Sequence, residues 1–221
     1  MMKSPEDPLR ELERFDSGGR AIRVETFGKE ERAPSVIVLH GATGVEYANR
    51  FIAGYARSIA TRGFVTHLIH YFDRTGTHYA DDATIESSSH EWREVVHDAV
   101  AFIRQRRPHA AVGVFGFSLG GYLAAAEVVR NEEVGAAVVL AGGLDEDSAQ
   151  NARRGAPVLI LHGANDTHVP VSEARKLEAA LARTGHPPVV HLYPGEEHIM
   201  SLPGFADVLM RSTEFLRRHL E

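Results

Sequence analysis

The sequence predicts an α/β fold in which a mostly parallel sheet carries helices on both faces. Strand-like and helix-like segments alternate from residue 21 to the end of the chain, as repeated strand–helix–strand units do. Some of the strand-like segments are unbroken apolar runs, such as residues 35–39 (SVIVL), which is typical of strands covered on both faces. The chain has 221 residues, so we expect a polar lead-in at residues 1–19 and a single domain at residues 20–221.

The expected strands are short and rich in β-branched residues. The first alternates apolar and polar residues, which predicts a half-buried strand. The later ones are more continuously apolar, which favours the interior of the sheet. We place the strands at residues 21–27, 35–39, 64–69, 111–115, 134–140, 158–161 and 189–192.

The expected helices carry apolar residues on one face and end at recognisable stop signals. The longest, residues 85–107, ends in basic residues followed by Pro108, which suits the negative end of a helix dipole and then stops the helix. Ser172 is the predicted N-cap of a later helix. We place the helices at residues 46–62, 85–107, 119–130, 172–183 and 205–220.

The composition excludes several classes of function. There are 24 Lys and Arg against 30 Asp and Glu, for a net charge of −6, which argues against binding nucleic acid or an anionic membrane. The absence of cysteine excludes disulfides, thiolate metal sites and a cysteine nucleophile. No apolar run has the length of a membrane span and residues 1–20 lack a signal-peptide pattern, so we expect a cytoplasmic protein. With nucleic acid and membranes disfavoured, we expect its partner to be a small molecule.

The segment at residues 116–121 (GFSLGG) is the strongest sign of chemistry. It follows a predicted strand and opens a predicted helix, which is the context of a nucleophile elbow. In such a turn Ser118 stands clear of the sheet, while Gly116 and Gly120 leave room for the crowded backbone. We therefore predict that Ser118 is a nucleophile; the alternative is an inert serine on a glycine-rich turn.

A nucleophilic serine needs a base, and the base needs a group that orients it. Asp166 follows the strand-like run VLILHG and His198 follows VVHLYPG, in the chain order serine, acid, histidine. We predict that Asp166 orients His198 and that His198 is the base, although Asp166 could instead be a turn or capping residue. Rival acids and bases also follow strand-like runs: Asp145, Asp147, His162 and His168.

Acyl transfer also needs N–H groups aimed at the developing oxyanion. Residues 40–44 (HGATG) follow a buried strand-like run, and their small side chains let the backbone approach a substrate. We predict that the N–H groups of Ala42 and Leu119 form the oxyanion hole. The alternative for residues 40–44 is an ordinary glycine turn.

Four segments together resemble a known family. They read VIVLHGATGV, GFSLGGYLAAA, LILHGANDTHVPV and LYPGEEHIM, and they are similar, in order, to the dienelactone hydrolase-like branch of the α/β-hydrolases over roughly residues 20–220. The resemblance implies the α/β-hydrolase fold, with Ser118, Asp166 and His198 as a catalytic triad and Ala42 and Leu119 as oxyanion donors. No long insertion follows residues 134–140, so we expect an open cleft without a large lid domain.

The chain departs from the namesake enzymes at two positions. Those enzymes use a cysteine nucleophile and carry an acidic residue at the position of Gly41, whereas this chain has Ser118 and Gly41. The departure favours a general serine esterase over the dienelactone reaction. A panel of aromatic and apolar residues flanks the expected site and either lines an acyl pocket or packs in the core: Tyr71, Phe72, Tyr79, Ile199, Met200 and Leu202.

The sequence therefore predicts a serine hydrolase that cleaves a small carboxylic ester or thioester without a cofactor. A lactone hydrolase or an acyltransferase could use the same triad, and a catalytically silent binding module is the alternative of another class. We expect no metal site either, because His90, Glu94 and His97 form a helix face that is typical of solvated surface and lack a further ligand. The oligomeric state and the natural substrate stay open.

Overall fold

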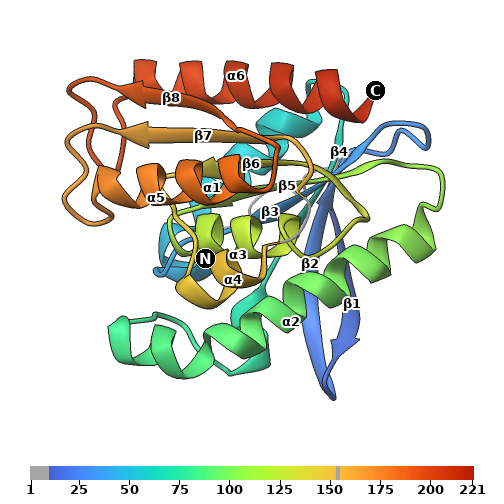
Figure 1. The fold of residues 1–221 in the computed structure, drawn as a ribbon. Helices are drawn as coiled ribbons and strands as arrows, with labels where there is room; N and C mark the ends of the chain where they lie inside the picture. The colour runs from blue at the N-terminus through green and yellow to red at the C-terminus, as the bar shows by residue number, and fades with distance from the viewer. Residues whose placement is uncertain (1–9, 153–154) are drawn as a thin grey trace.

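The structure, a computed structural model, describes residues 10–152 and 155–221 (Figure 1). Its strands are β1 (Arg10–Ser17), β2 (Arg20–Phe27), β3 (Ser35–Leu39), β4 (Val65–Ile69), β5 (Val112–Phe117), β6 (Val134–Leu140), β7 (Val158–Gly163) and β8 (Val189–Tyr193). Within the described residues they form one eight-stranded sheet in the order β1-β2-β4-β3-β5-β6-β7-β8. The pairs β1–β2 and β2–β4 are antiparallel, and every later pair is parallel. The predicted α/β class is confirmed.

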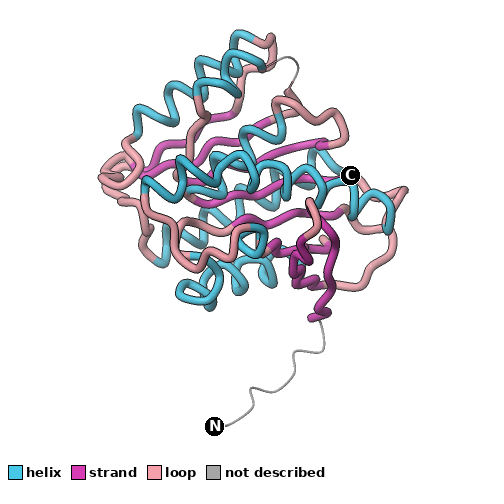
Figure 2. Tube along the Cα trace, turned by 90° about the horizontal axis from the view of Figure 1, so that it is seen from below, coloured by secondary structure: helices cyan, strands magenta, loops and turns pink. Residues whose placement is uncertain are grey.

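Helices cover both faces of this sheet, as Figure 2 shows. They are α1 (Gly44–Ala60), α2 (Asp82–Arg106), α3 (Leu119–Val128), α4 (Glu146–Asn151), α5 (Val171–Arg183) and α6 (Leu202–Leu220), and a short 3₁₀ helix, η1 (Tyr71–Arg74), follows β4. One apolar cluster joins the sheet to α2, α3 and α5. A second joins the opposite face to α1 and α6. This is the three-layer arrangement that strand–helix alternation predicts.

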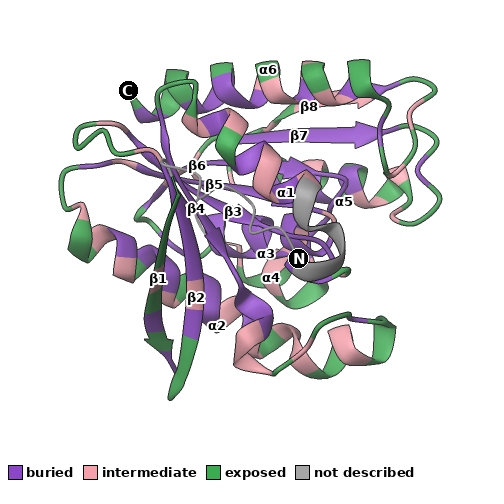
Figure 3. Cartoon of the chain, turned by 180° about the vertical axis from the view of Figure 1, so that it is seen from behind, coloured by how far each residue is buried: buried purple, intermediate pink, exposed green. Residues whose placement is uncertain are grey.

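The central strands are buried on both faces, which explains their unbroken apolar sequence. Every residue of β3 and β5 is buried, and Figure 3 shows the middle of the sheet as a continuous buried layer. The two largest fully buried side chains are those of Trp92 on α2 and Tyr71 on η1. Both belong to the cluster under α2 and α3, so this side of the core reaches the carboxyl ends of β3 and β4.

The N-terminal boundary of the sheet differs from the sequence prediction. Residues 10–17 were expected to belong to a polar lead-in, but they form strand β1, which pairs in register with β2 from Arg10↔Phe27 to Ser17↔Arg20. Only Phe15 and Ser17 of this strand are buried, and Figure 3 shows its outer side exposed. An edge strand with so few apolar residues carries little periodic signal, because it needs no apolar outer face. The remaining lead-in, residues 1–9, lies outside the described residues.

The cap of α5 is a second correction. Ser172 was expected to be the N-cap, but the N-cap position is Pro170 and Ser172 lies inside the first turn. The stop signals were more reliable: Gly63 and Gly185 follow their helices with φ of +95° and +83°, a backbone conformation that glycine adopts without steric cost. No helix in the part of the chain that the structure describes is both long and apolar enough to cross a bilayer.

Candidate active site

Ser118 occupies a sharp turn between β5 and α3. Its backbone has φ 56° and ψ −121°, a conformation that is costly for a residue with a Cβ atom. The turn is held by the N–H of Ser118, which donates to the carbonyl of Leu140 at 2.9 Å. Strain that the surrounding structure maintains at one serine, at the carboxyl end of a parallel strand, is typical of a functional position.

The glycines of this turn are required by space. A Cβ atom at Gly116 would lie 2.0 Å from the carbonyl oxygen of Gly120, and one at Gly120 would lie 2.5 Å from the carbonyl oxygen of His40. Both contacts are with backbone, which cannot move aside. The packing of both glycines therefore agrees with the crowded elbow predicted for this turn.

His198 links Ser118 to Asp166 through its two ring nitrogens. Its Nε2 lies 3.0 Å from Oγ of Ser118, and its Nδ1 lies 2.7 Å from Oδ2 of Asp166. Because a carboxylate accepts, Nδ1 donates to Asp166 and Nε2 is left to accept the hydroxyl proton of Ser118. The three side chains come from the loops after β5, β7 and β8, all at the edge toward which the arrows of β7 and β8 point in Figure 1.

Asp166 is buried and held from several directions. Its side chain has no exposed surface, and its Oδ1 accepts from the backbone N–H groups of His168 and Val169 at 2.9 Å each. Backbone donors fix the carboxylate within the turn and leave Oδ2 aimed at His198. The side chain of His198 is 12% exposed, so the ring reaches the surface where a substrate would bind.

The rival residues lie in other roles. Asp145 caps α4 by accepting from the N–H of Ser148 and pairs with Arg93, and Asp147 is exposed on the same helix. The ring of His168 stacks on His198 with centroids 5.2 Å apart. His162 also approaches Asp166, at 3.4 Å from Oδ2. This contact was not predicted from the sequence. The spacing of four residues between His162 at the end of β7 and Asp166 in the following turn could have indicated it.

The turn after β3 lies directly beside Ser118. Strands β3 and β5 are neighbours, with Leu39 opposite Gly116, and a Cβ atom at Gly41 would come 3.3 Å from Cβ of Ser118. An acidic side chain at position 41 would therefore contact Ser118. The N–H of Ala42 belongs to this turn, and the N–H of Leu119 opens α3, where helical N–H groups have no acceptor within the helix. The two predicted oxyanion donors thus come from adjacent strand ends.

We compared the sequence with models of known protein families. Residues 22–206 match the model of the dienelactone hydrolase family. The chain belongs to the dienelactone hydrolase family. No curated protein matches the sequence.

Solved structures show that this family member shares its fold with hydrolases of several kinds. One is a protein from Klebsiella pneumoniae subsp. pneumoniae MGH 78578 that has been assigned as a dienelactone hydrolase (TM-score 0.78, 19% identity, 95% of this chain and 98% of the other). Another is an esterase from Pyrococcus furiosus (TM-score 0.74, 16% identity, covering 96% of this chain and 93% of the esterase). A third is an acylaminoacyl peptidase from Pyrococcus horikoshii (TM-score 0.75, 16% identity). This match covers 96% of this chain but only 41% of the peptidase. The α/β-hydrolase fold is confirmed by these likenesses.

In this family member, His40 supports the turn at residues 40–44 (the oxyanion turn, named for the predicted donor Ala42). Its Nδ1 donates to the carbonyl of Gly41 at 2.8 Å, and Tyr71 stacks on the ring with centroids 4.0 Å apart while donating its hydroxyl to the carbonyl of His40 at 2.7 Å. Burial lowers the pKa of His40 to about 3, so the ring is neutral at neutral pH. A neutral ring packed in this way is a support for the turn and not a base.

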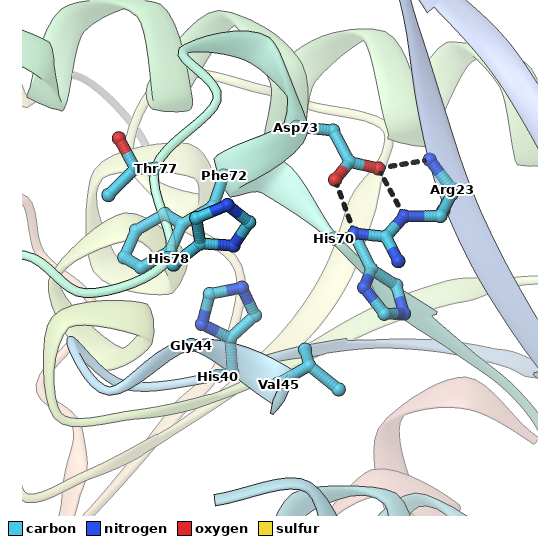
Figure 4. Close-up of a pocket in the computed structure, with 9 residues that line it drawn as sticks. All are labelled: Arg23, His40, Gly44, Val45, His70, Phe72, Asp73, Thr77 and His78. Carbon is cyan, nitrogen blue, oxygen red and sulfur yellow. Dashed lines mark hydrogen bonds and ion pairs between the residues drawn. The ribbon is translucent and has the colours of Figure 1, made fainter. Parts of the chain in front are cut away.

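A small cavity of about 20 Å³ lies beside His40 (Figure 4). Figure 4 shows the rings of His40, His70 and His78 around it, with Asp73 accepting from the side chain and backbone of Arg23. The fork between Arg23 and Asp73 ties η1 to β2. Because η1 carries Tyr71, these contacts stabilise the element that packs on the oxyanion turn.

The residues expected to line an acyl pocket divide into two groups. Tyr71, Phe72 and Met200 are buried in the two apolar clusters, so for them core packing is the correct alternative. The others are among the large apolar side chains that stay exposed: Tyr79, Ile199 and Leu202. Ile199 follows His198 directly, and the loop that carries Tyr79 is joined to the oxyanion turn by the N–H of Ala80, which donates to the carbonyl of Ala42 at 2.9 Å.

On the helix face that carries His90, Glu94 and His97, the last two side chains pair with residues of the protein. Glu94 pairs with Arg130 at 3.2 Å, and Nδ1 of His97 lies 3.1 Å from the buried carboxylate of Glu127. Across the residues that the structure describes, no group of three or more histidine, aspartate and glutamate side chains is placed to hold a metal ion.

Proposed function

We propose that this family member is a serine hydrolase that cleaves a small carboxylic ester or thioester through an acyl-enzyme. The observation that carries the proposal is the position of His198, with one ring nitrogen 3.0 Å from Oγ of Ser118 and the other 2.7 Å from Asp166. Nucleophile, base and orienting acid at these distances are what acyl transfer on a serine requires. The likeness to an esterase supports the ester class.

In the proposed reaction, Oγ of Ser118 attacks the carbonyl carbon while its proton passes to Nε2 of His198. The carbonyl oxygen becomes an oxyanion that accepts from the N–H groups of Ala42 and Leu119. When the intermediate collapses, the bond to the leaving alcohol or thiol breaks and that group takes the proton from His198. Water then attacks the acyl-enzyme in the same way and releases the acid and Ser118. The side chains and backbone N–H groups of the protein supply every catalytic group in these reaction steps, so no cofactor is required.

Asp166 makes His198 a better base by holding the hydrogen on Nδ1 and by stabilising the imidazolium that forms. The partner we propose is a small-molecule ester or thioester, bound at the open carboxyl edge of the sheet. Residue 41 is a glycine, so no acidic side chain stands beside Ser118 as one does in the namesake enzymes. This difference supports ordinary ester cleavage by Ser118 over the dienelactone reaction.

The test is the variant Ser118→Ala, assayed on p-nitrophenyl esters, thioesters and a lactone of graded chain length. We expect kcat to fall about 10³-fold or more, because the triad acts as a unit, and a fluorophosphonate probe to label the wild type only. The control is Ser17→Ala, which removes a buried hydroxyl that donates to Asp98 at 2.6 Å far from the site and should leave kcat unchanged. Near wild-type activity in Ser118→Ala would overturn the proposal.

A further inference from the structure

Two imidazoles converge on one oxygen of Asp166. Nδ1 of His198 lies 2.7 Å from Oδ2, and Nε2 of His162 lies 3.4 Å from the same atom. His162 comes from β7, and its side chain has no exposed surface. A buried histidine beside the proposed catalytic acid is not part of the proposed proton transfer, so its presence there needs a separate explanation.

His162 belongs to a series of hydrogen bonds that reaches the carboxylate of Asp166 through Val169. Its Nε2 lies 2.8 Å from the carbonyl oxygen of Val169, and the N–H of Val169 donates to Oδ1 of Asp166 at 2.9 Å. A carbonyl oxygen can only accept, so Nε2 of His162 carries a hydrogen. That N–H donates to the carbonyl of Val169, and its nitrogen lies 3.4 Å from Oδ2 of Asp166. These hydrogen bonds therefore tie the carboxyl end of β7 to the loop that carries Asp166.

The other nitrogen of His162 shows that packing alone does not explain this residue. Nδ1 is buried and has no hydrogen-bond partner among the described residues. An unpaired buried nitrogen is unfavourable, and an apolar side chain of similar size would fill the space without it. The favourable contribution of the ring must then come from its Nε2–H.

We propose that His162 is a positioning residue for the triad, whose Nε2–H holds the loop of Asp166 so that Oδ2 stays aligned with His198. This inference rests on the proposed function, because it assigns His162 a role in the same site. It predicts a loss of rate without a loss of substrate binding. A displacement of a reacting group by about 1 Å can cost on the order of 100-fold in rate.

The test compares a variant without a donor with one that retains it. His162→Leu removes the N–H, whereas the side-chain amide of His162→Gln can present an N–H at a similar reach. We expect kcat to fall roughly 10- to 100-fold in His162→Leu with KM within about threefold, and labelling of Ser118 by a fluorophosphonate to slow by the same factor. His162→Gln should recover to within roughly fivefold of the wild type.

His97 offers the matched control. Its Nδ1 also lies beside a buried carboxylate, that of Glu127, at 3.1 Å, but on α2 and outside the site. His97→Leu should leave kcat and the labelling rate unchanged. Circular dichroism and urea unfolding establish that each variant is folded, and His162→Met replaces His162→Leu if the latter does not fold.

The outcomes separate the inference from the function on which it rests. If Ser118→Ala remains active and the wild type is not labelled, the proposed function fails and the inference fails with it. If Ser118→Ala is inactive and the wild type is labelled, but folded His162→Leu matches the wild type, the inference alone is overturned. It is also overturned if folded His162→Gln is as impaired as His162→Leu.

Discussion

Two histidines in this molecule lie against buried carboxylates with similar geometry and different surroundings. In the site, His198 lies 2.7 Å from Asp166; between β2 and the end of β4, His70 lies 2.9 Å from Glu25. The far nitrogen of His198 faces Oγ of Ser118 at 3.0 Å. The second oxygen of Glu25 instead lies 2.9 Å from Nε of Arg10. An imidazole beside a carboxylate is therefore not a sign of catalysis by itself, and the pair of His198 is distinguished by the serine hydroxyl at its second ring nitrogen.

The carboxylates of the two pairs are also stabilised differently. Asp166 accepts from backbone N–H groups and has no Arg or Lys within ion-pair distance in the described residues. For Glu25, burial acts to raise the pKa, but the hydrogen bond and charge of His70, together with Arg10, outweigh it and hold the pKa below its usual value. A carboxylate neutralised by a fixed cation has less charge to offer an imidazolium, so the pair of Glu25 is suited to stability and the pair of Asp166 to the role in the proposed triad.

The sharpest test of this contrast changes each carboxylate to its amide. Asp166→Asn should lower kcat by about 10²- to 10⁴-fold, because an amide cannot hold the tautomer of His198 or balance its charge. Glu25→Gln should leave kcat within about threefold of the wild type. Steady-state kinetics on one activated ester measures both. Equal losses in the two variants would show that the pairs do not differ in function.

The second test concerns stability and its dependence on pH. The folded pKa of Glu25 is lowered, so its contribution is present above the unfolded value of about 4.5 and is lost as the pH falls through the folded value. We expect Glu25→Gln to lower the free energy of unfolding by about 1–3 kcal/mol at pH 7, with the difference shrinking below about pH 4.5. Urea unfolding at several pH values measures it. A difference that grows as the pH falls would contradict the expectation.

The third and smallest effect concerns a buried histidine without a carboxylate partner. His67 contacts the hydroxyls of Thr26 and Ser35, and burial lowers its pKa to about 3, with the nearby Arg107 and Arg106 acting in the same direction. The unfolded chain then binds a proton that the folded chain does not between about pH 6.5 and 3, so stability falls as the pH falls through that window.

The variant His67→Gln should remove this term. We expect the slope of the free energy of unfolding against pH, measured between pH 5 and 6.5, to decrease by up to about 1.4 kcal/mol per pH unit relative to the wild type. The neutral buried His40 contributes a similar slope, which remains in the variant. Because the comparison uses slopes, a constant loss from the missing contacts does not affect it. An unchanged slope would show that His67 is already protonated in the folded protein or remains neutral in the unfolded chain.

Much of this protein could be predicted from its sequence, because the signals concerned are local. The unbroken apolar runs of β3 and β5 mark strands that are covered on both faces, and the glycines around Ser118 mark a turn that only glycine can pack. The positions of Asp166 and His198 after later strands followed from the rule that functional groups gather at the carboxyl edge of a parallel sheet. Each of these statements depends on a few consecutive residues and one general rule.

Other features were decided only by the tertiary structure, because they depend on how strands, helices and loops pack against one another. Strand β1 exists because β2 offers it an edge, although its own sequence is largely polar. Tyr71 is a support for the oxyanion turn and not a pocket residue, because β4 brings η1 against His40. The approach of His162 to Asp166 depends on how the loop after β7 folds back over the strand end. Such contacts follow from strand order, loop path and side-chain direction, which the spacing of residues along the sequence does not fix.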